Sequence, residues 1–473
     1  MGNQFFRAAP ALLALALAAC GGTAANGAPA NAGPGDGGSG DGGSAGGASA
    51  PSLAQSTLAR VPGANVPPSS MAAASNANNA FAIDLFAHVR GSAPAGNLLT
   101  SPISASLALT MTYAGAKGAT ATQMATALHF GTTAGSTILE GQNEMSQLLA
   151  QRAQNALEAD MTSTSNYGEP APSSDDYALQ VVNSVWGQKS YPWDSSFLDV
   201  LAQNYGAGIY QEDFAAMPDP ARLAINAWVS ESTANKINDL LPSGSIDGDT
   251  RMVLANAVHL KLPWVTPFPA TGTMPGTFTT ASGAAVSVPF MNLVLGTGYV
   301  DDGQAQIVEL PLAGDGVRVL IALPHGDLAT YESGLTPTSA AFAPIGSAQV
   351  TLSLPKVSFT SPSFSLSAAL KAMGMADAFD GSVADFTGMC AHPPDGNLYV
   401  SDVLQKAMLA MQESGVEAAA ATAVIVSRTV SAEPPLPEVT MVVNRPFLVA
   451  IVDLSGPILF LGHIADPTAT GAP

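Results

Sequence analysis

A segment near the C-terminus, residues 413–438, constrains the fold of this chain more than any other. It reads ESGVEAAAATAVIVSRTVSAEPPLPE and has no charged side chain between Glu417 and Arg428. If residues 416–427 form a strand, their side chains alternate between its two faces, and apart from Glu417 both faces are small or apolar. This pattern suits a strand buried on both sides in the middle of a sheet. The prolines that follow cannot occupy a central strand, so such a strand must stop by about Glu433.

Two other structures are compatible with this segment. The alanines at 418–421 favour a buried helix, since alanine is the best helix former, but nothing marks a helix stop before the β-branched residues that follow. The segment is also compatible with a strand that belongs permanently to the core. As a permanently exposed loop it would be an aggregation hazard.

The net charge excludes several classes of partner. Asp and Glu outnumber Lys and Arg by 36 to 16, which gives a formal charge of −20. Nucleic acid and anionic membrane surfaces are not attracted to an acidic surface, so neither is expected to bind. The 473 residues are 47% apolar, enough to bury a sizeable core in one large or two ordinary domains.

The N-terminus predicts export. Arg7 precedes an apolar run, Ala8–Ala19, that is too short to span a bilayer and is typical of a signal peptide. The run ends in LAAC, which resembles the bacterial lipobox, so we expect a lipoprotein signal peptide over residues 1–19 and a lipid on Cys20. An ordinary cleaved signal is the alternative. If Cys20 carries lipid, Cys390 is the only other cysteine, and no intrachain disulfide is possible.

The signal leads into a predicted linker, residues 20–72, whose Gly/Ser/Ala-rich start cannot bury a core. It would hold a folded domain, residues 73–468, away from a membrane in the periplasm, at the outer membrane or at the cell surface; an extracellular protein is the alternative. The linker contains GGSAG, which matches the G-x-S-x-G hydrolase pattern. A nucleophile elbow needs a strand before it and a helix after it, so we take this match as accidental.

Helical spacing precedes strand-like runs along the folded part, which indicates the α+β class. A polar loop is expected at residues 161–176. Helices are expected at 78–90, 195–206 and 221–241 and, as a pair broken by glycine, over 104–130. Strands are expected at 177–188, 250–264 and, as two strands around a Gly-Pro turn, over 439–464, with shorter strands from 276 onward.

No local motif points to an enzyme, a metal site or a cofactor. The six histidines form no H-E-x-x-H or other metal-binding spacing, and the chain has no C-x-x-C, no P-loop and no G-x-G-x-x-G after a strand. A Ser-His-Asp site hidden by the fold is the remaining enzymatic alternative, and turnover of generic ester substrates would reveal it.

Several motifs, in order, resemble the serpin family. The hinge is ESGVEAAAAT, followed by NRPFLVAI and ILFLGHIADP; upstream, NLLTSPISASLALTMTYAGAKGATATQM and VLANAVHLKLPW resemble two further signatures. The resemblance covers residues 75–468. It implies the serpin fold, with helices, three β-sheets and an exposed reactive-centre loop. It also implies a monomeric, suicide-type inhibitor of serine endopeptidases that supplies no catalytic residues and is not an enzyme.

The resemblance also implies how such an inhibitor works. A target protease attacks one bond of the exposed loop, and the hinge side then inserts into the main sheet as a new central strand. If residues 416–429 all insert, the loop end moves about 45 Å, at roughly 3.3 Å per residue. A protease still bound as an acyl-enzyme is dragged along, and its distorted oxyanion hole no longer supports hydrolysis.

Small residues in the hinge favour an active inhibitor, because they pass between strands at little steric cost. Val416 departs from the family, which usually has Thr or Ser there, but a central strand accepts a β-branched residue, and Gly415 gives the backbone freedom to turn. The hinge residues are Glu413, Gly415, Val416, Glu417, Ala418, Ala419, Ala420, Ala421 and Thr422.

The scissile bond has two candidates. The usual spacing from Glu413 places the specificity residue at Thr429, with cleavage before Val430, which suits an elastase-like protease. Arg428 would suit a trypsin-like protease. A cysteine protease is an alternative target with either specificity residue.

Five further residues match the family's sheet-opening region: Ser101, Ser104, Asn256, Trp264 and Gln405. Gln405 stands where the family usually has histidine; it still donates and accepts hydrogen bonds but does not titrate. Ordinary core packing is the alternative role for all five. Val416 and Gln405 also leave open a non-inhibitory serpin that acts as a surface binding protein.

Overall fold

The computed structural model describes residues 51–92, 96–167, 172–314, 316–343, 346–394, 396–417 and 435–471. The helices are α1 (Pro68–Val89), α2 (Pro102–Tyr113), α3 (Gly118–Ala127), α4 (Gly135–Tyr167), α5 (Ser195–Tyr205), α6 (Pro218–Ser232), α7 (Leu328–Ser333) and α8 (Ser367–Ala372). The strands are β1 (Ser52–Ala54), β2 (Leu98–Thr100), β3 (Ala178–Gln188), β4 (Ile209–Glu212), β5 (Met252–Pro263), β6 (Met274–Thr279), β7 (Ala285–Asp301), β8 (Ala305–Pro311), β9 (Val317–Pro324), β10 (Ser347–Pro355), β11 (Val357–Thr360), β12 (Phe364–Ser365), β13 (Asp402–Gln412), β14 (Gly415–Val416), β15 (Glu438–Val442), β16 (Phe447–Asp453) and β17 (Ile458–Ile464).

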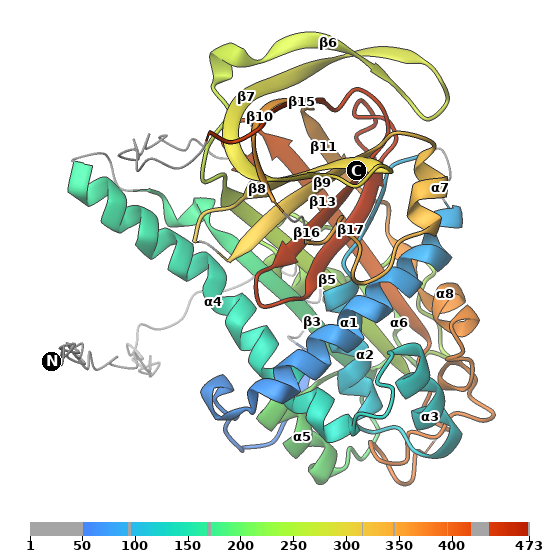
Figure 1. Cartoon of the computed structure of the whole chain (residues 1–473). Helices are drawn as coiled ribbons and strands as arrows, with labels where there is room; N and C mark the ends of the chain where they lie inside the picture. Colours follow the sequence, from blue (N-terminus) through green and yellow to red (C-terminus); the bar gives the residue numbers. More distant parts are fainter. Residues whose placement is uncertain are drawn as a thin grey trace, which may run out of the picture. The chain divides into compact units, whose positions relative to one another are not determined.

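The large sheet has the strand order β1-β4-β3-β5-β14-β13-β11, with β12 beside β13. Its centre is β5, which pairs with β3 along one edge and with β13 and β14 along the other, and which is buried at every position but Lys261. Figure 1 shows these strands running behind α1 and α2, with α6 beside them. The expected strand at 250–264 is therefore confirmed as the central strand of the large sheet.

The remaining strands form one second network, β15-β10-β7-β8-β9-β16-β17-β2, with β6 on β7. This network joins two layers of the expected serpin arrangement, because β7 is long: its first part pairs with β6 and β10, and Tyr299–Asp301 continue into a pairing with β8. A single long, twisting strand thus joins two layers through unbroken hydrogen bonds.

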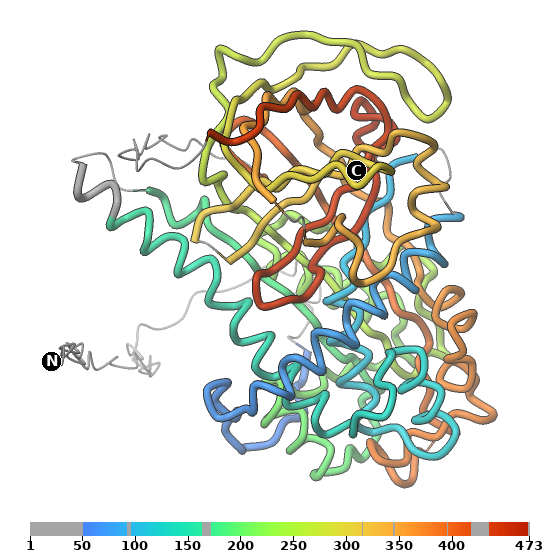
Figure 2. Tube along the Cα trace, viewed as in Figure 1, coloured from blue at the N-terminus to red at the C-terminus, as the bar shows by residue number. Residues whose placement is uncertain are grey.

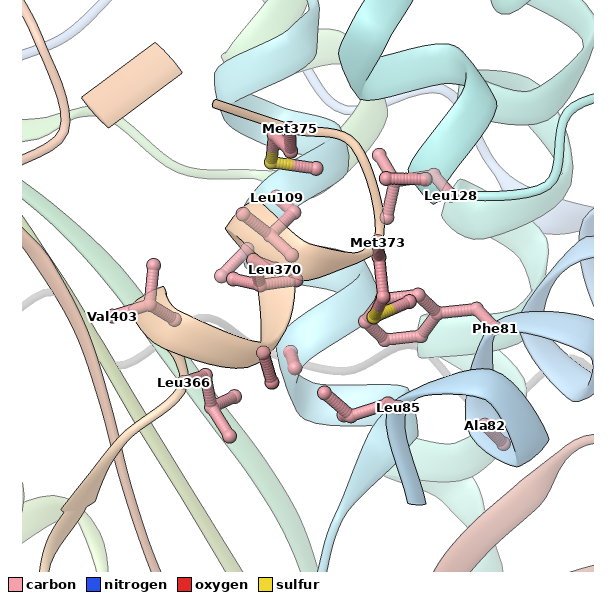
Figure 3. Close-up of a cluster of buried hydrophobic side chains, with 14 of the residues drawn as sticks. Phe81, Ala82, Leu85, Leu109, Leu128, Leu366, Leu370, Met373, Met375 and Val403 are labelled. Carbon is pink, nitrogen blue, oxygen red and sulfur yellow. The ribbon is translucent and has the colours of Figure 1, made fainter. Parts of the chain in front are cut away.

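The two ends of the folded part pack together. The hairpin of β16 and β17 pairs with β9 on one side and with β2 on the other, close to α1 (Figure 2). Beside it, α1, α2 and α8 bury a common apolar cluster against β13, as Figure 3 shows for Phe81, Leu85, Leu109, Leu370 and Val403. The α+β class is confirmed.

The folded part begins earlier than the sequence predicts. Residues 51–72 were expected to be linker, but β1 pairs with β4 and forms the end strand of the large sheet, and α1 begins at Pro68. Arg60 explains the difference, since its guanidinium donates to the side chains of Asn143 and Ser146 on α4 and to the carbonyl oxygen of Asn204 on α5. These hydrogen bonds order a segment that has little apolar surface of its own.

The ends of two helices also differ from the prediction. The expected loop at 161–176 is wrong over its first part, because α4 continues to Tyr167. The expected helix at 221–241 is also too long, since α6 ends at Ser232. The chain folds back there because the Asn226 side chain binds both the backbone N–H and the carbonyl oxygen of Leu241.

Among the described residues, no helix combines the length and the apolar character that a membrane crossing requires.

Candidate functional site in the large sheet

The hinge enters the large sheet at its first two positions. Gly415 and Val416 form β14, which pairs with β5 through Pro263 and Leu262 and with β13 through Met411 and Gln412. Val416 is buried on the core side of the sheet, only 2% exposed. The described part of the hinge therefore lies where a central strand is expected, between two strands that would otherwise be neighbours.

Close approach, and not turning, is what requires glycine at position 415. A Cβ there would lie 2.4 Å from the carbonyl oxygen of Leu262 and 2.7 Å from the Cα atom of Pro263. The backbone of Gly415 does not have a positive φ; among the hinge residues described, Glu417 does, at 47°. The turning freedom expected of Gly415 is therefore not used, and glycine is required there because any side chain would collide with the backbone of β5.

Glu417 lies in a buried cluster of charged groups. Its carboxylate is 2.6 Å from Nε2 of His259 on β5 and 2.6 Å from Nζ of Lys236 in the segment after α6. Burial raises the pKa of the carboxyl, but the hydrogen bonds from His259 and Lys236 outweigh burial and hold the pKa of Glu417 below its usual range. The carboxylate therefore stays ionised at neutral pH.

Glu413 anchors the start of the hinge. Its carboxylate accepts hydrogen bonds from Thr273 Oγ1 at 2.8 Å and Lys356 Nζ at 2.7 Å, which outweigh the effect of burial and lower the pKa of Glu413. Trp264 donates through Nε1 to the carbonyl oxygen of Gln412 and through its backbone N–H to that of Ser414. Trp264 therefore lies where the hinge enters the sheet, as the resemblance implies.

The other residues that match the family's sheet-opening region meet within the β5–β13 pairing. Gln405 and Asn256 are register partners on those two strands. Ser104 Oγ lies 2.7 Å from the side-chain amide of Asn183 on β3. With its nitrogen facing Ser104, this amide also donates to Oδ1 of Asn256 at 3.1 Å. The structure thus brings the four residues together, where side-chain hydrogen bonds link α2 to three strands.

Gln405 binds the backbone at the start of α2. Its Oε1 accepts from the backbone N–H of Ser101 at 3.0 Å, and its Nε2 donates to the Ser101 carbonyl oxygen at 2.8 Å. The Ser101 hydroxyl donates to the carbonyl oxygen of Leu459. The amide of Gln405 presents a donor and an acceptor side by side, so it binds both backbone groups of Ser101. A single neutral imidazole nitrogen either donates or accepts and could bind only one of them.

We expect Gln405→Leu to lower the free energy of unfolding by about 2–4 kcal/mol, because both backbone groups of Ser101 lose a buried partner. Urea unfolding of the uncleaved protein measures this loss. The matched control is Gln349→Leu on β10, at a position that is only part-buried and makes no such paired contact to a helix start. Equal losses in the two variants would contradict the assigned role of Gln405.

Sequence reasoning missed His259 and Lys236. His259 carried no local signal beyond its place in an apolar strand, and Lys236 fell within an expected helix. The remaining hinge residues (Ala418, Ala419, Ala420, Ala421 and Thr422), the scissile-bond candidates (Arg428, Thr429 and Val430) and Cys20 lie outside the described residues. Across the described part of the chain, no group of three or more His, Cys, Asp or Glu side chains is placed to hold a metal ion.

Comparison with known proteins agrees with this geometry. The family model described as "Serpin (serine protease inhibitor)" matches residues 76–467. Human plasminogen activator inhibitor 2 is 32% identical over 420 residues, covering 83% of this chain and 99% of the relative. The leukocyte elastase inhibitor of Bos taurus is 33% identical over 407 residues, with the same coverage. The family description and both names are those of inhibitors.

A solved structure extends the comparison to a binding protein. The crystal structure of human thyroxine-binding globulin, solved as a complex with its ligand, aligns with a TM-score of 0.70 at 25% identity. The alignment covers 84% of this chain and 100% of that chain. The same arrangement of sheets and helices is therefore found in proteins named as inhibitors and in one named for binding a small molecule.

Proposed function

Since the chain belongs to the serpin family, we propose that it inhibits a serine endopeptidase by covalent trapping. In this proposal the protease cleaves the loop that follows Glu417 and remains attached as an acyl-enzyme. The freed hinge then continues into the large sheet between β5 and β13. Trapping results because the attached protease is pulled away from the geometry that its deacylation requires.

The single observation that carries this proposal is the position of β14. Two hinge residues already pair with β5 and β13, so the next hinge residues have an unpaired edge on either side, and further insertion must separate the β5–β13 pairing beyond Val258 and Ala407. Each added residue forms backbone hydrogen bonds to two strands, which is the driving force of strand addition. The small side chains at 418–421 fit a strand buried on both faces.

The target class follows from the loop sequence. Thr429 before Val430 suits an elastase-like protease, and Arg428 suits a trypsin-like one. The similarity to a leukocyte elastase inhibitor supports the first of these, and the similarity to a plasminogen activator inhibitor leaves the second in place. A cysteine protease is the alternative target class.

Incubation with one protease of each class tests the function. We expect a complex that survives denaturing electrophoresis, together with a released C-terminal peptide that begins at Thr429 or Val430 by mass spectrometry. The start of this peptide identifies the specificity residue. Cleavage without a complex from either protease, and without a rise in thermal stability, would contradict covalent trapping.

A non-inhibitory serpin that acts as a surface binding protein is the second candidate. Its support is the similarity to thyroxine-binding globulin, together with the family departures at Val416 and Gln405. Loop cleavage that yields no covalent product would favour it.

We propose where the protein acts in the cell from its N-terminal sequence alone. A lipid on Cys20 would anchor the inhibitor to a membrane by the tether ahead of the folded part. Mass spectrometry of the N-terminal peptide, compared between the natural chain and Cys20→Ser, distinguishes lipidation from ordinary signal cleavage.

A further inference from the structure

The large sheet contains a short gap directly beyond β14. Strands β5 and β13 pair with each other from Val253 and Asp402 up to Val258 and Ala407. Further along they separate, and β14 fills the far end of the opening. Between these two regions lie residues 259–261 of β5 and 408–410 of β13. This gap is the path that an inserting hinge would take.

The backbone of Glu417 does not follow that path as an extended strand would. The register of β14 would place it against Lys261 and Ala410, and its backbone N–H does donate to the Ala410 carbonyl oxygen at 2.6 Å. Its φ of 47°, however, is left-handed, a conformation that is strained for a non-glycine residue and incompatible with a continuing strand. The described part of the hinge therefore pairs with the sheet as a strand up to Val416, and the backbone of Glu417 does not continue that strand.

The side chain of Glu417 is what holds this conformation. It is 8% exposed, and its two oxygens contact a cation from the segment after α6, Lys236, and an imidazole from β5, His259. Both contacts are 2.6 Å long. The His259 contact is a hydrogen bond to a carboxylate, a kind about twice as strong as a neutral one, and the Lys236 contact is an ion pair, so together they offset the strain of the left-handed backbone.

The segment that carries Lys236 also accepts hydrogen bonds from β13 and from a side chain near it. Lys406 of β13 donates to the carbonyl oxygen of Asn238 at 2.9 Å, and the hydroxyl of Ser363 donates to that of Leu240. The segment begins after α6 with two left-handed residues, Ala234 and Asn235. It thus contacts β13, and through Lys236 it contacts the hinge, so movement of the hinge and movement of this segment are coupled.

We propose that Glu417 is a stop that limits insertion of the uncleaved hinge to Gly415 and Val416. Full insertion requires residue 417 to change from a left-handed to an extended backbone and to break its contacts with His259 and Lys236. The stop thus opposes insertion until loop cleavage makes the whole strand available. This inference rests on the proposed function, because it concerns how the same hinge is regulated.

Spontaneous insertion of the uncleaved protein is the measurement. Glu417→Gln keeps the side-chain shape and removes the charge, and Lys236→Met removes the exposed partner, whose side chain is 43% accessible. At an elevated temperature we expect both variants to convert at least tenfold faster than the natural protein into a form that resists loop cleavage and melts at a higher temperature.

Two controls separate a stop from a general loss of stability. Lys236→Arg keeps the cation and should convert at the natural rate. Glu309→Gln removes a part-buried carboxylate that is 2.7 Å from Arg318 in the second network, and it should also convert at the natural rate. Conversion of Glu417→Gln and Lys236→Met at the natural rate, or no conversion of any protein, would overturn the stop.

Failure of the stop and failure of the proposed function give different results. A natural protein that traps protease, with variants that convert at its rate, refutes the stop alone. If cleaved natural protein gains no thermal stability and forms no covalent complex, the hinge does not insert and the proposed function fails. If the two variants convert faster but no covalent complex forms, the proposed role of Glu417 is supported and covalent trapping is contradicted.

Discussion

Replacing Val416 with arginine is expected to turn the protein from an inhibitor into a substrate of its target protease. Val416 lies between Leu262 and Met411, and all three belong to the same buried apolar cluster. An arginine at this position must leave the sheet or bury an unpaired charge, which costs several kcal/mol. Insertion past this point slows, and the acyl-enzyme has time to hydrolyse.

The size of the effect follows from that cost. A penalty of about 3 kcal/mol corresponds to a change of more than 100-fold in the competition between insertion and deacylation, at 1.4 kcal/mol per tenfold. Denaturing gels measure it as the ratio of covalent complex to cleaved inhibitor. Cleavage itself should continue, because the substituted residue lies far from the scissile-bond candidates in the sequence.

Val416→Thr is the matched control for the arginine variant. Threonine is β-branched and nearly the same size, so it should insert and retain most of the covalent complex. If Val416→Arg traps protease as well as Val416→Thr does, insertion of residue 416 is not part of the trapping reaction. In that case β14 has a structural role only.

Replacing Arg152 with methionine is expected to cost about 3–5 kcal/mol in the free energy of unfolding, because it leaves a buried charge without its partner. Arg152 on α4 makes two hydrogen bonds of 2.7 Å to the carboxylate of Asp453 on β16, whose side chain is fully buried. The hydroxyl and backbone N–H of Ser455 also donate to this carboxylate but bring no positive charge. Urea unfolding of the uncleaved protein measures the loss.

Arg222→Met provides the comparison at a pair whose carboxylate is exposed. Arg222 is 2.7 Å from Asp219, whose side chain is 63% exposed, so water solvates this carboxylate when the cation is lost. Arg222 also donates to the carbonyl oxygen of Leu241, so we expect a loss of about 1–2 kcal/mol, smaller than that of Arg152→Met. Similar losses for the two arginine variants would mean that burial of Asp453 does not determine the stability of the contact between α4 and β16.

Much of the fold follows from local patterns. The strand at 250–264 was predicted because its apolar residues run without interruption, and it forms the centre of the large sheet. The helix at 195–206 was predicted from its spacing and is observed as α5, with Gly206 in a left-handed conformation at its end. Such elements can be predicted locally, because the apolar run that becomes buried and the glycine that ends a helix lie within or next to the element itself.

Other boundaries depend on distant partners. Residues 51–72 are ordered because Arg60 reaches α4 and α5, and α6 ends early because Asn226 binds Leu241. Neither contact has a local signature. The number of sheets likewise depends on β7 continuing from one layer into the next, and the sequence pattern alone does not show where a strand changes partners.

The family resemblance, the α+β class and the two-sided pattern of the hinge can be predicted from the sequence, because each is expressed in consecutive residues. The pairing of Gly415 and Val416 with β5 and β13, and the contacts of Glu417, are visible only in the folded chain. Glu417, His259 and Lys236 are far apart along the chain and meet because β5, β14 and the segment after α6 converge. Contacts of this kind depend on burial and distance, which no linear pattern of residue types contains.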